Sequence, residues 1–244
     1  MRPIEKGESP YAKIKAYQTA FPYLKKRLGD YCSFCEMRVN NALAVEHKES
    51  KNSGGALTDW NNLLLSCTYC NSRKGEKIKK GEADRWLWPD EHNTFLAFSY
   101  ENAVPKVAEN YLRTVGEDAL QKAKAVLKGL ALDSHPDAVN MCVSGKNRDK
   151  RWEKRFETLN IAEDAKQAWQ ECKDTEFRAV EMKNIMNLAK GYGFFSIWMM
   201  VFAEEDEVKN VLIRAFAGTA TDCFDEHGNS IRQIDRKLIK SISE

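Results

Sequence analysis

Apolar residues recur at helical spacing through most of the second half of the chain. Four segments share this pattern, at residues 116–130, 145–172, 174–190 and 194–216. In the second of them, Trp152, Phe156 and Leu159 are separated by four and three positions, which places them on one helix face. The last segment has a polar dip at the acidic run 204–207, and a tail is expected after Gly218. The pattern predicts a mainly helical C-terminal half.

The first half alternates between short apolar runs and polar loops. A helix is predicted near residues 13–28, with Pro22 marking a break or turn inside it. The run 43–47 predicts a short strand that ends at His47. Residues 61–66 follow a glycine loop as a second strand, and a helix is expected from Cys70 onward. This order of strand, loop, strand and helix predicts a ββα unit, and the whole chain is expected to be of the α+β class.

Two Cys-x-x-Cys pairs bracket that unit. Cys32 and Cys35 precede it, and Cys67 and Cys70 follow after 31 intervening residues. Four thiolates at this spacing suit one tetrahedral zinc ion with no open position, and such an ion is structural. The alternative is four cysteines that merely pack together. The remaining cysteines are scattered and odd in number (Cys142, Cys172 and Cys223), which argues for a reducing compartment over a disulfide framework.

Between and just after the cysteine pairs lie residues suited to phosphodiester hydrolysis. His47 is a candidate general base because its ordinary pKa is near neutrality. In an extended segment, Glu46 points to the opposite side and can hold a hard cation, for which Asn71 offers an amide oxygen. Lys74 follows one helical turn later and is placed to meet a phosphate oxygen. The alternatives are a surface histidine for His47 and a solvated basic face for Lys74.

Asn62 is expected to tie the loop after His47 to the next strand through its amide. Asn61 competes for that role. The surrounding third of the chain is basic, with 16 lysines and arginines against 10 acidic residues up to Arg85, although the net charge of the chain is only +2. Since phosphate neutralisation contributes much of nucleic-acid binding, this excess makes nucleic acid a natural partner, and the alternative is a mildly uneven surface.

These residues resemble the HNH endonucleases, a branch of the ββα-metal nucleases. The family pattern is an acid-His pair, a glycine loop, Asn-Leu, and Cys-x-x-Cys-Asn-x-x-Lys. In this chain it stands as Glu46-His47, Gly54-Gly55, Asn62-Leu63 and Cys67 to Lys74. The resemblance implies DNA cleavage with His47 as base, a catalytic ion on Glu46 and Asn71, loop support by Asn62, and structural Zn²⁺ on the cysteines.

Two positions depart from the commoner family pattern. The acid is glutamate rather than aspartate, and the last metal position is Asn71 rather than histidine. Both departures leave open whether the catalytic ion is Mg²⁺ or Mn²⁺. With this resemblance, the expected organisation is a lead-in helix at 1–30, the HNH nuclease domain at 31–85, a connector at 86–112 that contains a strand near 93–100, and a mainly helical domain at 113–244 that is a candidate for docking a partner.

A looser resemblance extends further along the chain. Segments such as Trp88-Pro89-Asp90 and Phe216-Ala217-Gly218-Thr219 are similar to bacterial HNH proteins of anti-phage operons, and the HNH subunits of Septu systems come nearest. That likeness implies an ATPase protein as partner. The apolar residues that would form the interface, with ordinary helix core as their alternative, are Phe194, Phe195, Trp198, Met199 and Met200.

Two other functions fit part of the sequence. A zinc-stapled DNA-binding module without catalysis would use the cysteines and the basic face, but it leaves Glu46, His47 and Asn71 without a role. A stand-alone restriction-type HNH nuclease would use the same chemistry without a partner. The longest apolar run, near 193–203, is shorter than the about 20 residues that a bilayer span needs, so no membrane contact and a cytoplasmic location are expected.

Overall fold

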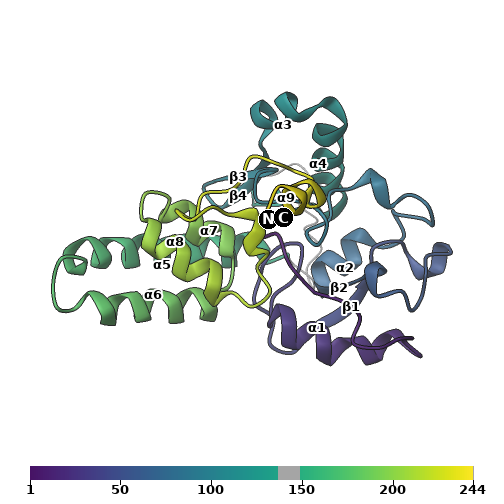
Figure 1. Ribbon diagram of the computed structural model, residues 1–244, viewed down its shortest axis with the longest axis horizontal. Coiled ribbons are helices and arrows are strands. Elements are labelled where there is room, and N and C mark those ends of the chain that lie inside the picture. The colour runs from purple at the N-terminus through teal and green to yellow at the C-terminus, as the bar shows by residue number, and fades with distance from the viewer. Residues whose placement is uncertain (137–148, 244) are drawn as a thin grey trace.

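The computed structural model describes residues 1–136 and 149–243, so Cys142 and the start of the predicted segment 145–172 lie outside the described residues. The helices are α1 (Phe21–Leu28), α2 (Thr68–Lys74), α3 (Glu109–Val115), α4 (Glu117–Leu130), α5 (Arg151–Cys172), α6 (Arg178–Tyr192), α7 (Phe195–Val201), α8 (Asp206–Ala215) and α9 (Arg236–Ser243). The strands are β1 (Leu43–His47), β2 (Leu63–Cys67), β3 (Phe98–Glu101) and β4 (Val104–Val107). The predicted α+β class is confirmed (Figure 1).

The ββα unit is built from β1, β2 and α2. The two strands pair antiparallel, with Leu43 opposite Cys67 and His47 opposite Leu63. All residues of β2 are buried, whereas β1 alternates between half-buried and exposed before it becomes buried at Glu46 and His47. The chain turns directly from β2 into α2, whose N-terminus is capped by the Cys67 sulfur accepting from the Cys70 amide at 3.4 Å. The strand and helix order predicted for this stretch is therefore present.

Two elements of the first half differ from the predicted bounds. The helix expected at 13–28 begins only at Phe21, after a short 3-10 turn at Tyr17–Ala20, because proline fits the first helical turn, where no amide hydrogen is needed. The strand expected at 93–100 begins at Phe98. The side chain of Asn93 is instead buried and donates hydrogen bonds to Ser230 and to the carbonyl of Ile231, which holds this stretch out of the hairpin.

The helical half has its own buried cluster. Helices α5, α6, α7 and α8 pack around Trp169, Trp198 and Phe195 (Figure 1). The segment predicted as one helix at 194–216 is split at its acidic dip, where Glu205 accepts a hydrogen bond from the Trp169 indole at 2.9 Å. Of the apolar residues considered for an interface, Phe194, Phe195, Trp198 and Met199 are buried in this cluster and Met200 packs against it, which agrees with the core interpretation.

A second buried cluster joins the N-terminal segment, the ββα unit and α4. Polar contacts then connect it to the C-terminal segment. Lys48, the residue after His47, forms ion pairs with Asp90 and Glu91, and Asp90 also pairs with Lys6 at 2.7 Å. Arg236 in α9 donates to the carbonyl of Asp90 at 3.0 Å. The end of β1 is therefore fixed by buried charges that come from both ends of the chain.

A helix that crosses a bilayer must be about 20 residues long and predominantly apolar. Helix α5 is the longest, with 22 residues, and it carries many charged side chains. Within residues 1–136 and 149–243, no helix is both long and apolar enough to cross a membrane.

Candidate functional site

The four paired cysteines meet at one point. Cys32 and Cys35 lie in the loop before β1, and Cys67 and Cys70 lie at the end of β2 and in the first turn of α2. Their sulfur atoms all lie within 4.8 Å of one another, and the Cys35 and Cys67 sulfurs are 3.7 Å apart. Zinc–sulfur bonds of about 2.3 Å in a tetrahedron place sulfurs about 3.8 Å apart. The geometry therefore fits one zinc ion.

The surroundings of the cysteines also favour a cation. All four are buried, and burial raises the pKa of the Cys35 and Cys70 thiols well above their ordinary range. Without a cation, ionised sulfurs in such a site would be costly. A divalent ion supplies the missing charge, and its binding energy becomes folding energy for the loop, strand and helix that carry the four cysteines. The donor set has no open position, so the ion it suits is structural.

A residue far along the chain reaches this cluster. The Arg151 guanidinium, buried at the start of α5, donates to the Cys70 sulfur at 3.3 Å and to the carbonyl of Ala131 at 2.8 Å. Asp149 accepts three hydrogen bonds from the same side chain and balances its charge. Arg151 therefore links the zinc ligands to the helical half, and nothing in its local sequence indicated this role.

Replacement of Arg151 by methionine is expected to weaken zinc binding about 10- to 100-fold, because groups that hydrogen-bond to metal ligands contribute by that amount. Zinc affinity is measured by competition with a chromogenic chelator. Lys154→Met is the matched control, since this lysine is exposed on the same helix. Unchanged zinc affinity in Arg151→Met, with loss of thermal stability only, would limit the role of Arg151 to packing.

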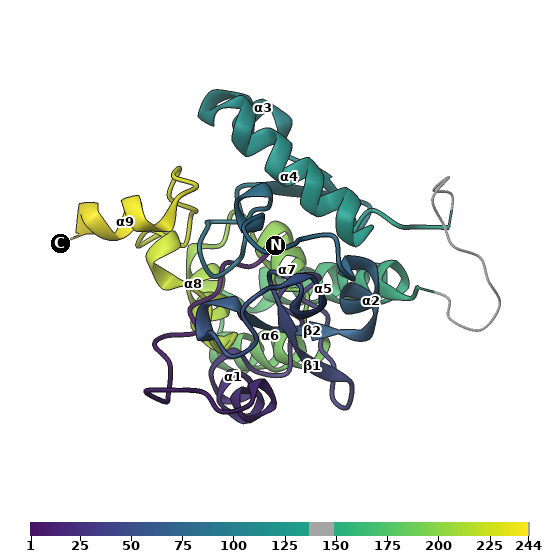
Figure 2. The ribbon, with the colours of Figure 1, turned by 90° about the vertical axis from the view of Figure 1, so that its right-hand side faces the viewer.

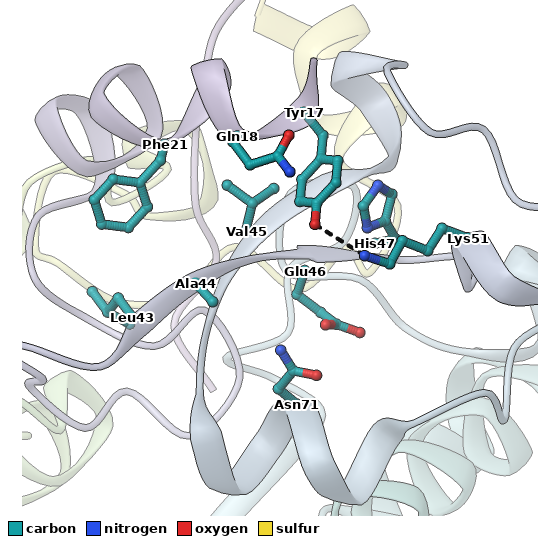
Figure 3. A pocket seen from close by; sticks show the side chains of 10 residues that line it. All are labelled: Tyr17, Gln18, Phe21, Leu43, Ala44, Val45, Glu46, His47, Lys51 and Asn71. Atoms are coloured by element: carbon teal, nitrogen blue, oxygen red, sulfur yellow. Dashed lines mark hydrogen bonds between the residues drawn. The ribbon is translucent and has the colours of Figure 1, made fainter.

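A pocket of about 530 Å³ opens beside the ββα unit (Figure 3). Three of the predicted site residues line it: Glu46 and His47 from the end of β1, and Asn71 from α2. Its other lining residues are Tyr17, Gln18, Phe21, Leu43, Ala44, Val45 and Lys51. In Figure 3, His47 and Glu46 leave the strand on opposite sides, and Glu46 points toward Asn71. The structure thus brings the candidate base and both candidate ion ligands into one cavity.

His47 is held in a defined orientation. It is 5% exposed, its Nε2 lies 3.0 Å from the Leu57 carbonyl, and its ring meets the Tyr17 ring edge-on with centroids 4.8 Å apart. Because a carbonyl only accepts, this hydrogen bond requires the proton on Nε2 and leaves the Nδ1 lone pair free in the neutral ring. Burial lowers the pKa of His47 below its ordinary value of 6.5. The imidazole is therefore neutral at pH 7, as a general base must be.

Glu46 and Lys74 form a buried ion pair at the base of this pocket. Lys74 is 0% exposed, and its ammonium nitrogen lies 2.9 Å from a Glu46 carboxylate oxygen. Burial raises the pKa of Glu46, and the positive charge of Lys74 opposes that shift. Lys74 thus contacts the carboxylate rather than solvent, which is a different position from the surface contact with phosphate expected from the sequence.

Asn62 makes the contacts expected of a residue that ties the loop after His47. Its side-chain oxygen accepts from the Glu49 amide at 2.8 Å, and its side-chain nitrogen donates to the carbonyls of Glu49 and Ala56. The loop passes so close to itself that a Cβ on Gly55 would lie 2.2 Å from the Glu49 oxygen. Only glycine fits there, and the loop leads directly to Leu57, whose carbonyl orients His47.

Replacement of Asn62 by alanine is expected to lower the free energy of unfolding by about 2–3 kcal/mol, because three hydrogen bonds of the loop lose their partner. Urea unfolding gives this value directly. Asn61→Ala is a sharp control, since Asn61 is adjacent and exposed, and its described hydrogen bonds use only its backbone. Equal losses in the two variants would show that Asn62 has no special part in holding the loop.

Two further residues of the pocket, Tyr17 and Lys51, were not predicted from the sequence. Lys51 donates to the Tyr17 hydroxyl at 2.9 Å, and its ammonium lies 4.6 Å from the Tyr17 ring centroid. Tyr17 comes from a helical lead-in segment where an aromatic residue has no distinctive spacing. Lys51 belongs to the general basic excess of this third of the chain. No local pattern could have separated these two residues from their neighbours, because only the fold brings them to His47.

The comparisons with known proteins concern this same region. Residues 30–77 match the family model described as HNH endonuclease. The matched range holds both cysteine pairs, the Glu46-His47 pair and the whole of α2. No curated protein matches the chain, and no solved structure does. Residues 30–77 therefore carry an HNH endonuclease domain with a four-cysteine cluster that could hold a metal ion, and at the level of the family this domain implies nuclease activity.

Proposed function

We propose that the protein is a metal-dependent HNH endonuclease that hydrolyses phosphodiester bonds in DNA. The observation that carries the proposal is the single pocket that joins Glu46, His47 and Asn71 within the family-matched range. Glu46 and Asn71 would hold a divalent ion, Mg²⁺ or Mn²⁺, which when bound offsets the charge that develops on the phosphate and the leaving oxygen. Carboxylate and amide oxygens are the donors that such hard cations prefer.

His47 acts as the general base. The free Nδ1 lone pair takes a proton from a water molecule as the water oxygen attacks phosphorus, and the bond from phosphorus to the leaving oxygen breaks. The Leu57 carbonyl keeps the ring in the required tautomer, and the edge of Tyr17 limits its rotation. The imidazolium that forms returns its proton to solvent or to the leaving oxygen, which restores the neutral base.

Lys74 and Asn62 act through other residues. Lys74 keeps the Glu46 carboxylate ionised in a buried setting and fixes its direction. Asn62 holds the loop that presents the Leu57 carbonyl to His47. Cys32, Cys35, Cys67 and Cys70 hold a structural Zn²⁺ that joins the loop before β1 to the start of α2. The relative position of β1 and α2, which carry the candidate catalytic residues, therefore depends on this cluster.

Cleavage of supercoiled plasmid with Mg²⁺ and with Mn²⁺ tests the proposal. In Glu46→Gln we expect the ion concentration for half-maximal cleavage to rise at least about tenfold, because a charged ligand becomes a neutral one of equal size. Glu76→Gln is the control, since Glu76 is exposed just after α2 and does not line the pocket. Tight DNA binding without products under either ion would favour the alternative, a zinc-stapled binding module without catalysis.

We further propose that the nuclease serves as an anti-phage defence effector beside an ATPase protein, as the resemblance to Septu-type HNH proteins implies. The mainly helical residues after 113 are the candidate docking part of the chain. Co-purification with the product of a neighbouring ATPase gene, and cleavage that appears only when both proteins are present, would support this arrangement. Full cleavage activity of the isolated chain would instead favour a stand-alone restriction-type nuclease.

A further inference from the structure

The pocket beside the ββα unit is larger than its three candidate catalytic residues require. His47, Glu46 and Asn71 occupy one end, while Phe21 and Leu43 lie together at the other end (Figure 3). The pocket volume of about 530 Å³ is within the range of about 300–1,000 Å³ that is typical of ligand sites in proteins. The cavity therefore has room for a group that is attached to the scissile phosphate.

The end away from His47 is apolar and aromatic. Phe21, Leu43 and Val45 are half-buried, because one side of each packs on the core cluster while another side lines the pocket. The exposed amide of Gln18 lies between this end and Tyr17 (Figure 3). A flat ring with polar edges would cover the apolar side chains and leave its edge within reach of an amide.

The wall that provides these features lies partly outside the family match. Tyr17, Gln18 and Phe21 all precede residue 30, where the match begins. The family-matched range thus supplies the reacting groups, whereas the lead-in segment shapes the space beside them. A substrate preference of this chain would arise from that segment.

A positive charge lies at the His47 end of the pocket (Figure 3). Lys51 is exposed, and its ammonium is kept at the pocket by the Tyr17 hydroxyl and ring. The positive charge of Lys51 lowers the pKa of His47, although burial lowers that pKa more. A phosphate that enters near His47 would meet this ammonium, so the exposed Lys51, rather than the buried Lys74, is placed for contact with a phosphate.

We propose that the pocket binds one unpaired nucleotide of the substrate strand, with its base against Phe21, Leu43 and Val45 and its phosphate between Lys51 and His47. This inference rests on the proposed nuclease function and specifies its substrate. A base in an intact duplex is stacked and paired, so it cannot enter a side pocket without first being extruded. The enzyme therefore acts preferentially on single-stranded or locally opened DNA. The apolar end is continuous with the end where a phosphate would lie between Lys51 and His47. A nucleotide, which joins a flat base to a phosphate, therefore fits both ends at once.

Binding without hydrolysis tests the inference directly. A tetranucleotide of DNA and its fully abasic analogue carry the same phosphates, and both compete with a fluorescent single-stranded oligonucleotide in buffer without added Mg²⁺ or Mn²⁺, so that cleavage is suppressed while the structural zinc stays bound. Wild-type protein is expected to prefer the tetranucleotide at least about fivefold, the lower end of what one stacked base contributes. Phe21→Leu keeps the apolar packing but removes the aromatic face, so most of this preference is expected to disappear. Tyr23→Ala, on the same helix but outside the pocket, is expected to retain it.

Cleavage assays distinguish a failure of this inference from a failure of the proposed nuclease function. Wild-type protein is expected to cleave single-stranded DNA at least about fivefold faster than a matched duplex at low substrate concentration, and Phe21→Leu is expected to lose this ratio mainly through KM. Cleavage without any base or strand preference would overturn the subsite and leave the nuclease intact. Base-dependent binding without cleavage, both in the absence and in the presence of the neighbouring ATPase protein, would support the subsite and refute the nuclease. Equal binding of the abasic analogue by wild-type protein overturns the inference whether or not cleavage occurs.

Discussion

Replacement of His47 by alanine is expected to reduce plasmid cleavage by about 100- to 10,000-fold, the contribution that a positioned general base usually makes. The reason is geometric, since Nδ1 of His47 is the free lone pair in a buried ring whose Nε2 is committed to the Leu57 carbonyl. Zinc content is expected to stay close to that of the wild type, because His47 is not one of the four clustered cysteines. Single-turnover cleavage rates measure the loss.

The pH dependence of the same reaction gives a second measurement. A general base works in its neutral form, so the cleavage rate rises with pH through the pKa of His47 and levels off above it. Because burial lowers this pKa, the acid limb of the wild-type profile is expected below pH 6.5. The limb should vanish in His47→Ala. His227→Ala is the matched control, because that ring is 60% exposed and pairs with Asp206 on α8. Cleavage retained by His47→Ala would refute its assignment as the base.

Replacement of Cys70 by serine is expected to unfold the ββα unit and abolish cleavage. Structural zinc in small domains contributes about 10–16 kcal/mol near neutral pH, which equals or exceeds the about 5–15 kcal/mol by which most domains are stable. Cys70 joins α2 to the cluster, and Arg151 donates to the same sulfur, so its loss affects both halves of the chain. Metal analysis, thermal unfolding and limited proteolysis report zinc content, stability and local order.

Cys172→Ser is the control for that experiment. Cys172 is a free, half-buried cysteine at the end of α5, outside the cluster. Its replacement should leave one zinc ion per chain and an unchanged melting temperature. If Cys70→Ser retained both, the four cysteines would be packing residues, which is the alternative that their sequence spacing left open. Removal of zinc with a strong chelator should reproduce the effect of Cys70→Ser in the wild-type protein.

Several features of the site were predictable from local sequence. The two Cys-x-x-Cys pairs predicted the metal cluster because two residues between cysteines let both sulfurs of a turn face one ion. The strand at 43–47 followed from a short apolar run before a loop, and a helix was expected from Cys70 onward, whereas α2 begins at Thr68. Alternation along an extended segment predicted that Glu46 and His47 leave the strand on opposite sides, as Figure 3 shows. Each of these inferences depends on residues close together in the chain.

Sequence by itself thus determined the metal cluster, the order of the ββα unit and the residue types available for hydrolysis. The tertiary structure alone decided which distant residues meet: Tyr17 contacts both His47 and Lys51, and Arg151 contacts the Cys70 sulfur. It also buried Lys74 against Glu46. The physical reason is that turns and periodic patterns act over a few residues, whereas these contacts arise from packing between segments that lie tens of residues apart.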